Sequence, residues 1–209
     1  MSEPRPAFGR DSKRELAVGE YLDEHLYPNE FASFERIHDK ERQLQGIDVV
    51  ARHSSIEGEL LIDEKAATSW AHKGDLKTFA FELSSMYGNR EMGGWFLDLE
   101  SRNQTTHWLC VWPRTDGAPI KNSTDISHAE AILVSVRKLR NWVRRHSSKD
   151  SGYIEDAISL LRDGAVNQVK WSGLRVMISR QLPEKPINLL IPRDIIRELG
   201  GGLVWKLTP

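Results

Sequence analysis

Cysteine is nearly absent from this chain of 209 residues. The single cysteine, Cys110, lies in the apolar run 108–112, so an internal disulfide framework is excluded and the thiol is predicted to be a small buried side chain. No apolar stretch reaches the length of about 18 residues that a membrane-spanning helix requires, so no membrane span is expected. Residues 1–5 lack the apolar core of a signal peptide, and the expected compartment is the cytoplasm.

Several common functional motifs are absent as well. The seven histidines include no close pair with the spacing of zinc ligands, which argues against a zinc site. No G-x-S-x-G nucleophile elbow occurs, although a Ser/His/Asp hydrolase is not thereby excluded. The glycine run 200–202 is followed by neither a helix start nor a lysine-serine pair, so it is predicted to be a turn rather than a phosphate-binding loop. The net charge of −1 shows no overall basic excess that would indicate a polyanionic partner.

The composition is typical of a globular protein, with 39% hydrophobic and 28% charged residues. This hydrophobic fraction is sufficient to form a hydrophobic core. Apolar periodicity and turn residues predict helices over 12–26 and 76–87 and strands over 31–37, 44–52, 59–67, 95–99 and 106–112. The strands 44–52 and 59–67 are predicted to form a β-hairpin. The order helix, strand, strand, strand, helix, strand, strand is typical of an α/β fold, a mixed central β-sheet flanked by helices.

The second half of the chain is predicted to add helices and short strands. A polar loop over 114–126 precedes a basic helix over 127–146, and residues 147–152 are the best candidate for a linker. After it we expect a helix over 153–161, apolar strands over 174–178 and 187–191, a short helix after Pro192 and a terminal strand after Gly202. This organisation predicts a core of residues 1–146 and a C-terminal α+β extension, 147–209, that packs on the core.

Charged residues interrupt two of the apolar runs. Asp63-Glu64-Lys65 stands in the middle of one run, and Asp48 stands in another. Buried charges are costly unless they are paired or bind a metal. Residues two apart in a strand share a face, so Asp63 and Lys65 point the same way, Glu64 points away, and Asp48 can approach Asp63 from the neighbouring strand. Two alternatives stay open, a solvated turn at 63–65 and an Asp48 paired with Arg52 at a sheet edge.

Glu15 is a candidate third carboxylate. The helix predicted over 12–26 has an apolar stripe that consists of Val18, Gly19, Leu22 and Leu26. Glu15 falls in the middle of this stripe and can therefore reach the sheet, unless it serves only as a capping-box partner of Ser12. Magnesium prefers hard oxygen ligands and keeps several of its waters. The candidate magnesium ligands are therefore Glu15, Asp48, Asp63 and the backbone carbonyl of Glu64, with Lys65 beside the attacking water.

The pattern Asp48…Asp63-Glu64-Lys65 resembles the D…(D/E)-x-K signature of the PD-(D/E)XK, restriction-endonuclease-like nucleases. Glu15 on the first helix and the two charged strands also resemble the corresponding parts of small bacterial members of that superfamily. The likeness covers residues 12–112, about half the chain.

The resemblance implies an αβββαβ core. By the same resemblance, Asp48 and Asp63 would bind the metal, Lys65 would serve the water and Glu15 would complete the site. Two features depart from the family pattern. Ile47 stands where the family name has proline, and no glutamine follows Lys65 as it does in exonuclease-type variants.

The function expected from these residues is that of a magnesium-dependent DNA endonuclease, with manganese as a substitute metal. Cleavage of both strands would favour a homodimer through two-fold symmetry. The alternative is a catalytically inactive module of the same fold that binds DNA or a protein partner. A third interpretation, an unrelated α/β interaction domain, predicts that Asp48, Asp63 and Lys65 do not cluster at all.

Nucleic-acid contacts are expected at two places. The helix predicted over 127–146 carries five basic residues, Arg137, Lys138, Arg140, Arg144 and Arg145, which either contact phosphates or form a solvated face. Trp70, in the loop directly after Lys65, either stacks on a base or sugar or lies in the core. Glu82, on the helix predicted over 76–87, either approaches the site or is solvated.

Overall fold

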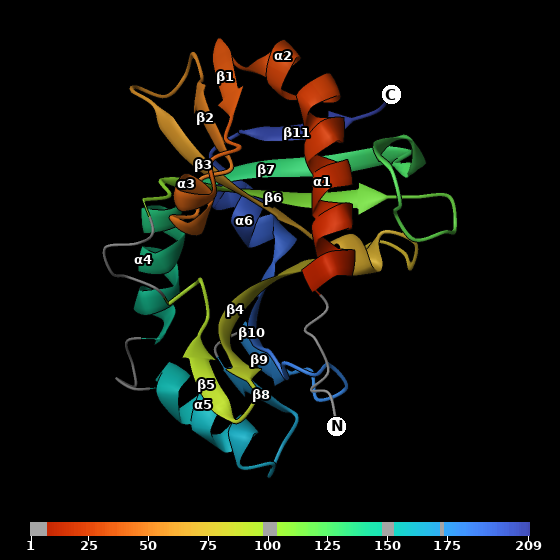
Figure 1. The fold of residues 1–209 in the computed structure, drawn as a ribbon. Helices are drawn as coiled ribbons and strands as arrows, with labels where there is room; N and C mark the ends of the chain where they lie inside the picture. Colours follow the sequence, from red (N-terminus) through yellow and green to blue (C-terminus); the bar gives the residue numbers. More distant parts are fainter. Residues whose placement is uncertain (1–7, 98–103, 148–152, 172–173) are drawn as a thin grey trace. The chain divides into compact units, whose positions relative to one another are not determined.

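The computed structural model of the protein describes residues 8–97, 104–147, 153–171 and 174–209 (Figure 1). Its helices are α1 (Phe8–His25), α2 (Tyr27–Glu30), α3 (Lys40–Leu44), α4 (Val136–Ser147), α5 (Tyr153–Arg162) and α6 (Arg193–Gly200), with the 3-10 turns η1 (Thr68–Trp70) and η2 (Ser123–Asp125). Its strands are β1 (Ser33–Arg36), β2 (Val49–Arg52), β3 (Leu60–Ala66), β4 (Thr78–Tyr87), β5 (Arg90–Gly93), β6 (His107–Arg114), β7 (His128–Ser135), β8 (Gln168–Trp171), β9 (Leu174–Ile178), β10 (Ile187–Pro192) and β11 (Val204–Leu207).

The described chain divides into two compact units, each with its own sheet. The six-stranded unit comprises the described residues of 7–76, 100–138 and 196–209, and the five-stranded unit those of 77–99 and 139–195. This division differs from the boundary expected after residue 146. The reason is the antiparallel pairing of β4 with β10, which joins a strand of the first half of the chain to a strand of the second.

The sheet of the six-stranded unit is mixed. Its strand order is β1-β2-β3-β6-β7-β11, and its neighbours are antiparallel except for β3 and β6, which run parallel. The predicted hairpin is confirmed, because β2 pairs with β3 in a register that sets Val49 opposite Ile62. The expected α/β fold with a mixed sheet is confirmed at this level.

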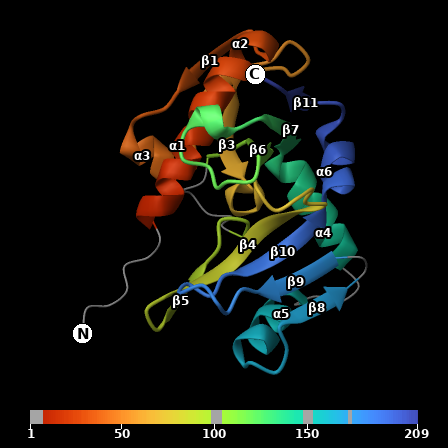
Figure 2. The ribbon, with the colours of Figure 1, turned by 90° about the vertical axis from the view of Figure 1, so that its right-hand side faces the viewer.

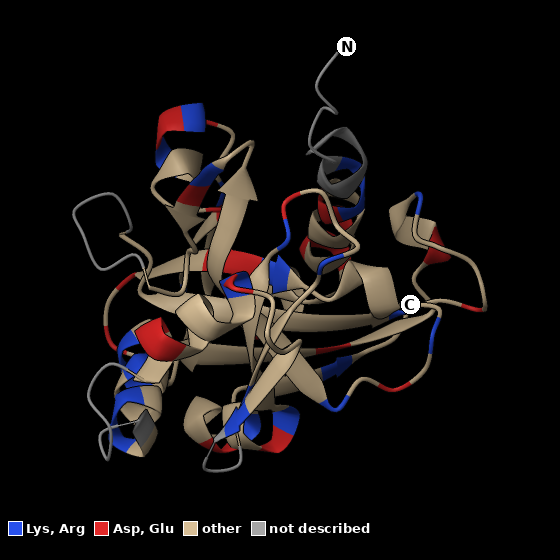
Figure 3. Ribbon diagram, turned by 90° about the horizontal axis from the view of Figure 1, so that it is seen from below, with Lys and Arg blue, Asp and Glu red and all other residues tan. Residues whose placement is uncertain are grey.

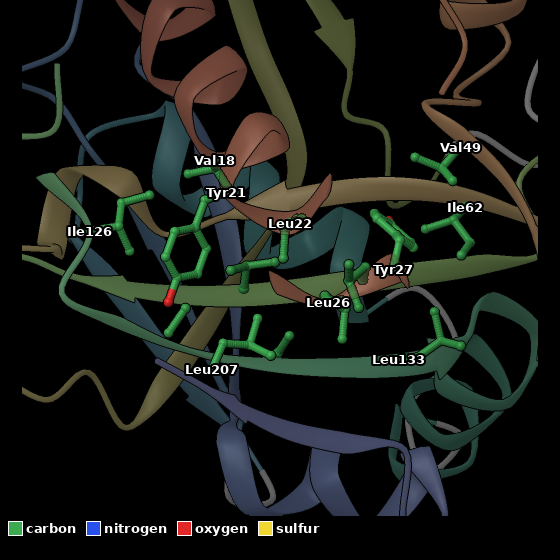
Figure 4. Packing of buried hydrophobic residues seen from close by; sticks show 14 of the residues in the cluster. Val18, Tyr21, Leu22, Leu26, Tyr27, Val49, Ile62, Ile126, Leu133 and Leu207 are labelled. Atoms are coloured by element: carbon green, nitrogen blue, oxygen red, sulfur yellow. The ribbon is translucent and has the colours of Figure 1, made fainter. Parts of the chain in front are cut away.

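Helix α1 covers one face of this sheet (Figures 1 and 4). The predicted apolar stripe of the helix is buried, and Val18, Leu22 and Leu26 pack into a cluster with Ile62 and Leu133 of the sheet. Complete burial of a side chain of this size stabilises a fold by about 1.5–3 kcal/mol. The helix is thereby held against the strands that carry the candidate site residues.

The sheet of the five-stranded unit is antiparallel throughout, in the order β5-β4-β10-β9-β8 (Figure 2). Helix α5 contacts β8 and β9. The helix at 153–161 and the strands at 174–178 and 187–191 were predicted correctly. The strands β5 and β8 were not predicted.

Three predicted elements are wrong. Residues 78–87 form strand β4 instead of a helix, residues 95–97 form a turn instead of a strand, and residues 128–135 form strand β7, so that the basic helix begins only at Val136. The remaining residues of the strand expected at 95–99, and most of the linker expected at 147–152, lie outside the described residues. Between β3 and β6, the described residues therefore form η1, β4 and β5 instead of the expected helix.

Two smaller differences concern capping and turns. Helix α1 begins at Phe8, so Ser12 lies inside it, and the capping-box interpretation of Glu15 is wrong. The charged turn before β2 contains the short helix α3, whose N-cap Asp39 accepts a hydrogen bond from the Arg42 N–H. Among the helices of the described residues, none has the length and apolar character needed to cross a membrane.

Candidate active site

Asp48 stands immediately before β2, where the backbone ladder between β2 and β3 ends. Its N–H donates to the carbonyl of Ile62, with a nitrogen–oxygen distance of 2.8 Å. Its carboxylate Oδ2 accepts the N–H of Glu64, also at 2.8 Å. The Asp48 side chain therefore takes the place of a backbone acceptor, which fixes the carboxylate against β3.

Alternation along β3 separates two sets of side chains. Leu60 and Ile62 belong to the buried cluster under α1, so Asp63 and Lys65 lie on the opposite face. Asp63 is 3% exposed, and the Lys65 Nζ lies 2.7 Å from its Oδ1. Asp48 is within hydrogen-bonding reach of Asp63. The structure thus brings together three of the four side chains expected from the sequence, and we call them the Asp48–Asp63–Lys65 cluster.

The surroundings of this cluster are apolar on the side of β6. In the parallel register, Asp63 is the partner of Trp108 and Lys65 the partner of Cys110, and both β6 residues are completely buried. The predicted burial of Cys110 is confirmed. Burial raises the pKa of its thiol, with a further contribution from the Asp63 carboxylate, which favours the neutral form. A low-polarity wall of this kind strengthens electrostatic interactions between the charged groups beside it.

The charges of the cluster act on one another. Burial raises the pKa of Asp48 to about 6, and the Asp63 carboxylate adds to this, while Lys65 and the Glu64 N–H act in the opposite direction. Burial alone would lower the pKa of Lys65, but Asp63, Asp48 and Glu15 outweigh it and the net pKa is raised. Lys65 is therefore a protonated ammonium group at neutral pH.

Glu15 lies on α1 and is exposed. Its charge acts on Lys65, but its exposure differs from the expected position in the middle of the buried stripe. No group of three or more His, Cys, Asp or Glu side chains suited to a metal ion occurs within the described residues. The expected cluster of three carboxylates is therefore not found there, and the acidic pair consists of Asp48 and Asp63.

The side chain of Glu64 points to the α1 face, away from the cluster, as predicted. There it accepts hydrogen bonds from Tyr27 and Arg36, and Arg36 also binds Asp23. The backbone N–H of Glu64 points to Asp48, and the N–H and C=O of one strand residue point toward the same neighbouring strand. The Glu64 carbonyl is thus directed to the side of Asp48, where it was expected as a ligand.

Three of these residues, Asp23, Tyr27 and Arg36, were not predicted from the sequence. A usable signal was present, because a glutamate inside an apolar strand requires a buried cation as its partner. The sequence alone does not identify which arginine provides it, since Arg36 lies 28 residues before Glu64.

Trp70 lies in η1, directly after β3, and is 50% exposed, so its interpretation as a core residue is wrong. The Lys73 Nζ lies 5.1 Å from the centre of its ring, which is a cation–π distance. Glu82 lies on strand β4 of the five-stranded unit rather than on a helix, and its approach to the site stays a prediction.

The five basic residues do lie on one helix, α4, at the left of the view in Figure 3. Arg137, Lys138, Arg144 and Arg145 are exposed. Arg140 is half-buried, and it donates to the backbone carbonyls of Phe96 at 2.9 Å and Trp95 at 3.2 Å. Arg140 therefore has a structural role within the five-stranded unit, and its expected contact with nucleic acid stays a prediction.

Comparison of the chain with protein-family models, with curated proteins and with solved structures finds no match. The chemistry of the site is therefore inferred from its residues alone. These are two carboxyl groups in mutual contact, an ammonium group bound to one of them, and an adjacent backbone carbonyl, all held by two hydrogen-bonded strands of a mixed sheet.

Proposed function

We propose that the protein is a metal-dependent nuclease that hydrolyses phosphodiester bonds, with DNA as the favoured substrate. The observation that carries this proposal is the position of Asp48, Asp63 and Lys65 on one face of two paired strands. This order and placement resemble the D…(D/E)-x-K signature of the PD-(D/E)XK nucleases, which supports the proposal. The antiparallel strands β1, β2 and β3, followed by β6 parallel to β3, are compatible with that core, although a helix is missing from the described part of the connection.

The donor set fits magnesium. Proteins often bind this ion through only one or two carboxylates and leave the remaining positions to waters and substrate phosphates. Asp48 and Asp63 provide two carboxylates, and the Glu64 carbonyl is directed to the same side. The raised pKa of Asp48 indicates that burial and Asp63 leave its negative charge incompletely neutralised. A divalent cation bound there would supply the missing positive charge, polarise a phosphoryl oxygen and activate water.

The residues of the cluster have separate roles in this proposal. Asp48 and Asp63 hold the cation. Lys65 remains protonated, so it orients the attacking water and stabilises negative charge on the phosphate instead of accepting a proton. Glu15 contributes a negative charge that favours the protonated form of Lys65.

Nicking of a supercoiled plasmid in the presence of magnesium or manganese tests the proposal. We expect Asp63→Asn and Lys65→Met to lower the rate by roughly 10²–10³-fold, the effect of removing one group that stabilises a transition state. Glu59→Gln is the matched control, because Glu59 is an exposed carboxylate just before the same strand, bound to Arg52 at 3.1 Å. Equal cleavage by the wild type and both site variants would refute the assignment.

The second candidate is an inactive nuclease-fold module that binds DNA or a protein. It is favoured by the lack of a group of three metal-binding side chains among the described residues. The two functions differ in one measurement, since the inactive module binds plasmid DNA without nicking it at any concentration of manganese. Cleavage that depends on Asp63 and Lys65 excludes the inactive module.

A further inference from the structure

Behind the Asp48–Asp63–Lys65 cluster, on the α1 face of the sheet, lies a network of four side chains that we call the Arg36 network. It consists of Asp23 of α1, Tyr27 of α2, Arg36 of β1 and Glu64 of β3. Arg36 donates from Nη1 to Glu64 Oε2 and from Nη2 to Glu64 Oε1, both at 3.0 Å. Tyr27 donates its hydroxyl to Glu64 Oε1 at 2.7 Å. Glu64 is thus held by three hydrogen bonds.

The other side of the guanidinium is fixed equally well. Arg36 donates from Nε and Nη2 to the two carboxylate oxygens of Asp23, at 2.5 and 2.7 Å, and from Nη2 to the carbonyl of Gly19 at 3.1 Å. A Cβ atom at Gly19 would lie 3.2 Å from Nη1, so a glycine there leaves room for the guanidinium. The planar fork of arginine suits such paired contacts, and a lysine could not reproduce them.

Burial of the charged groups of this network has an unfavourable desolvation free energy. The network places two carboxylates and one guanidinium in a site where the Arg36 side chain is 19% exposed and the Glu64 side chain 10% exposed. Well-packed apolar residues often replace such groups without loss of stability. The presence of a glutamate here therefore calls for a role beyond packing.

The backbone of Glu64 connects the network to the cluster. Glu64 is the residue between Asp63 and Lys65, and its N–H is the group that fixes the Asp48 carboxylate. We propose that the Arg36 network positions the Glu64 backbone, so that its carbonyl and the Asp48 and Asp63 carboxylates meet at the distance a divalent cation requires. Tyr27 and Arg36 are then positioning residues of the metal site. This inference rests on the proposed function.

Two tyrosines of the same core allow a matched test. Tyr27→Phe removes one hydrogen bond to Glu64, whereas Tyr21→Phe removes a buried hydroxyl that has no hydrogen-bond partner among the described residues. Both side chains are at most 1% exposed and belong to the same hydrophobic cluster. A purely structural role of the tyrosine rings would make the two variants behave alike.

Calorimetric titration with manganese chloride measures the effect without requiring cleavage. We expect Tyr27→Phe to raise the Kd for manganese about tenfold and Glu64→Gln to raise it at least as much, because partners of metal ligands commonly affect affinity to this extent. Tyr21→Phe keeps the wild-type Kd. In the nicking assay, Tyr27→Phe needs about tenfold more manganese for half-maximal rate but reaches a maximal rate within about twofold of the wild type. Gly19→Ala places a Cβ atom 3.2 Å from Arg36 Nη1 and is expected to shift the Kd in the same direction.

Asp63→Asn separates the failure of this inference from the failure of the proposed function. If Asp63→Asn abolishes manganese binding while Tyr27→Phe binds like the wild type, the positioning role is refuted and the metal site stands. If the wild type binds no manganese, or Asp63→Asn binds it unchanged, both the metal site and the positioning role fall. Circular dichroism of each variant establishes that the folded protein is being titrated.

Discussion

At Asp48, burial and the neighbouring Asp63 carboxylate act in the same direction and raise the pKa from 3.8 to about 6. The folded protein therefore binds this proton more tightly than the unfolded chain. The stability that the group contributes is complete below about pH 4, decreases as the pH rises through 6, and is absent above that. The carboxylate is thus a source of instability at neutral pH, when no cation balances it.

This residue yields a prediction about pH. Asp48→Asn removes the ionisation but keeps an oxygen that can accept the Glu64 N–H. With chelator present, we expect the variant to be more stable than the wild type by about 1–3 kcal/mol at pH 8, and the difference to vanish near pH 4. Urea unfolding at several pH values measures it. A difference that is constant with pH would contradict the position of Asp48 beside Asp63.

The contact between Lys65 and Asp63 can be tested by a double-mutant cycle. Lys65→Met leaves two buried carboxyl groups without their cation, so we expect a loss of about 2–4 kcal/mol in the free energy of unfolding at pH 8. In an Asp63→Asn background, the same substitution should cost about 0.5–3 kcal/mol less, which is the range for residues in direct contact. Additive effects of the two substitutions would show that the 2.7 Å pair is not formed in solution.

The cluster could be predicted at the level of single residues because strand alternation is local. Asp63 and Lys65 share a face whatever strand they pair with. To place Asp48 beside Asp63, it was enough to predict that two consecutive strands form a hairpin. Arg36 could not be predicted in the same way, because its choice of Glu64 depends on how β1 and β3 meet the same helix. Glu15 was expected in the buried stripe of α1 from the helical period, but it is exposed, and it belongs to no group of three metal-binding side chains among the described residues.

Among the elements, β4 shows how one pattern supports two structures. Leu76, Phe79, Ala80, Leu83 and Tyr87 fit a helical stripe, whereas the alternative set Phe79, Phe81 and Leu83 alternates as a strand does. Pairing with β10, about a hundred residues later in the chain, decides the outcome. The burial agrees, since Phe81 is completely buried and Tyr87 is 70% exposed.

Substitutions in β4 distinguish the two structures. Ala80 is exposed in the strand but would face the core in the helix, and Phe81 shows the reverse. We therefore expect Ala80→Thr to change the free energy of unfolding by less than about 0.5 kcal/mol, and Phe81→Ala to lower it by about 3–5 kcal/mol. Urea unfolding of both variants gives the comparison. A destabilising Ala80→Thr beside a neutral Phe81→Ala would support the helix.

Residues 128–135, which form strand β7, were predicted to be helical for a different reason. Residues 131–134 are all buried, so both faces are covered and the apolar run lacks the alternation that marks a half-buried strand. The basic residues nevertheless fall on the helix that follows, because α4 begins at Val136, just before the first of them.

Helix α4 also yields a prediction for DNA binding. Arg144→Gln combined with Arg145→Gln should reduce the slope of log K against log salt concentration by about 1–2, since each lost phosphate contact removes about 0.9. Fluorescence anisotropy with duplex DNA at several salt concentrations measures the slope. Arg52→Gln, which removes an exposed arginine from β2, is the control. An unchanged slope would show that these arginines form only a solvated face.

For the whole molecule, the α/β class could be predicted from composition and the order of elements, but the division into two sheets could not. That division depends on the pairing of β4 with β10, a long-range choice that local patterns do not encode. It has a consequence for metal binding. All of the proposed ligands, and Lys65, belong to the six-stranded unit.

Metal should therefore stabilise one unit selectively. At a manganese concentration of 100 times the Kd, mass action adds about 2.7 kcal/mol to the unfolding free energy of the unit that binds it. We expect hydrogen–deuterium exchange to slow in β2 and β3 on addition of manganese and to stay unchanged in β9 and β10 of the five-stranded unit. Asp63→Asn should abolish the effect, since it removes a ligand but leaves both sheets in place. Equal protection of both units, or protection that persists in Asp63→Asn, would mean that the ion does not bind at the cluster.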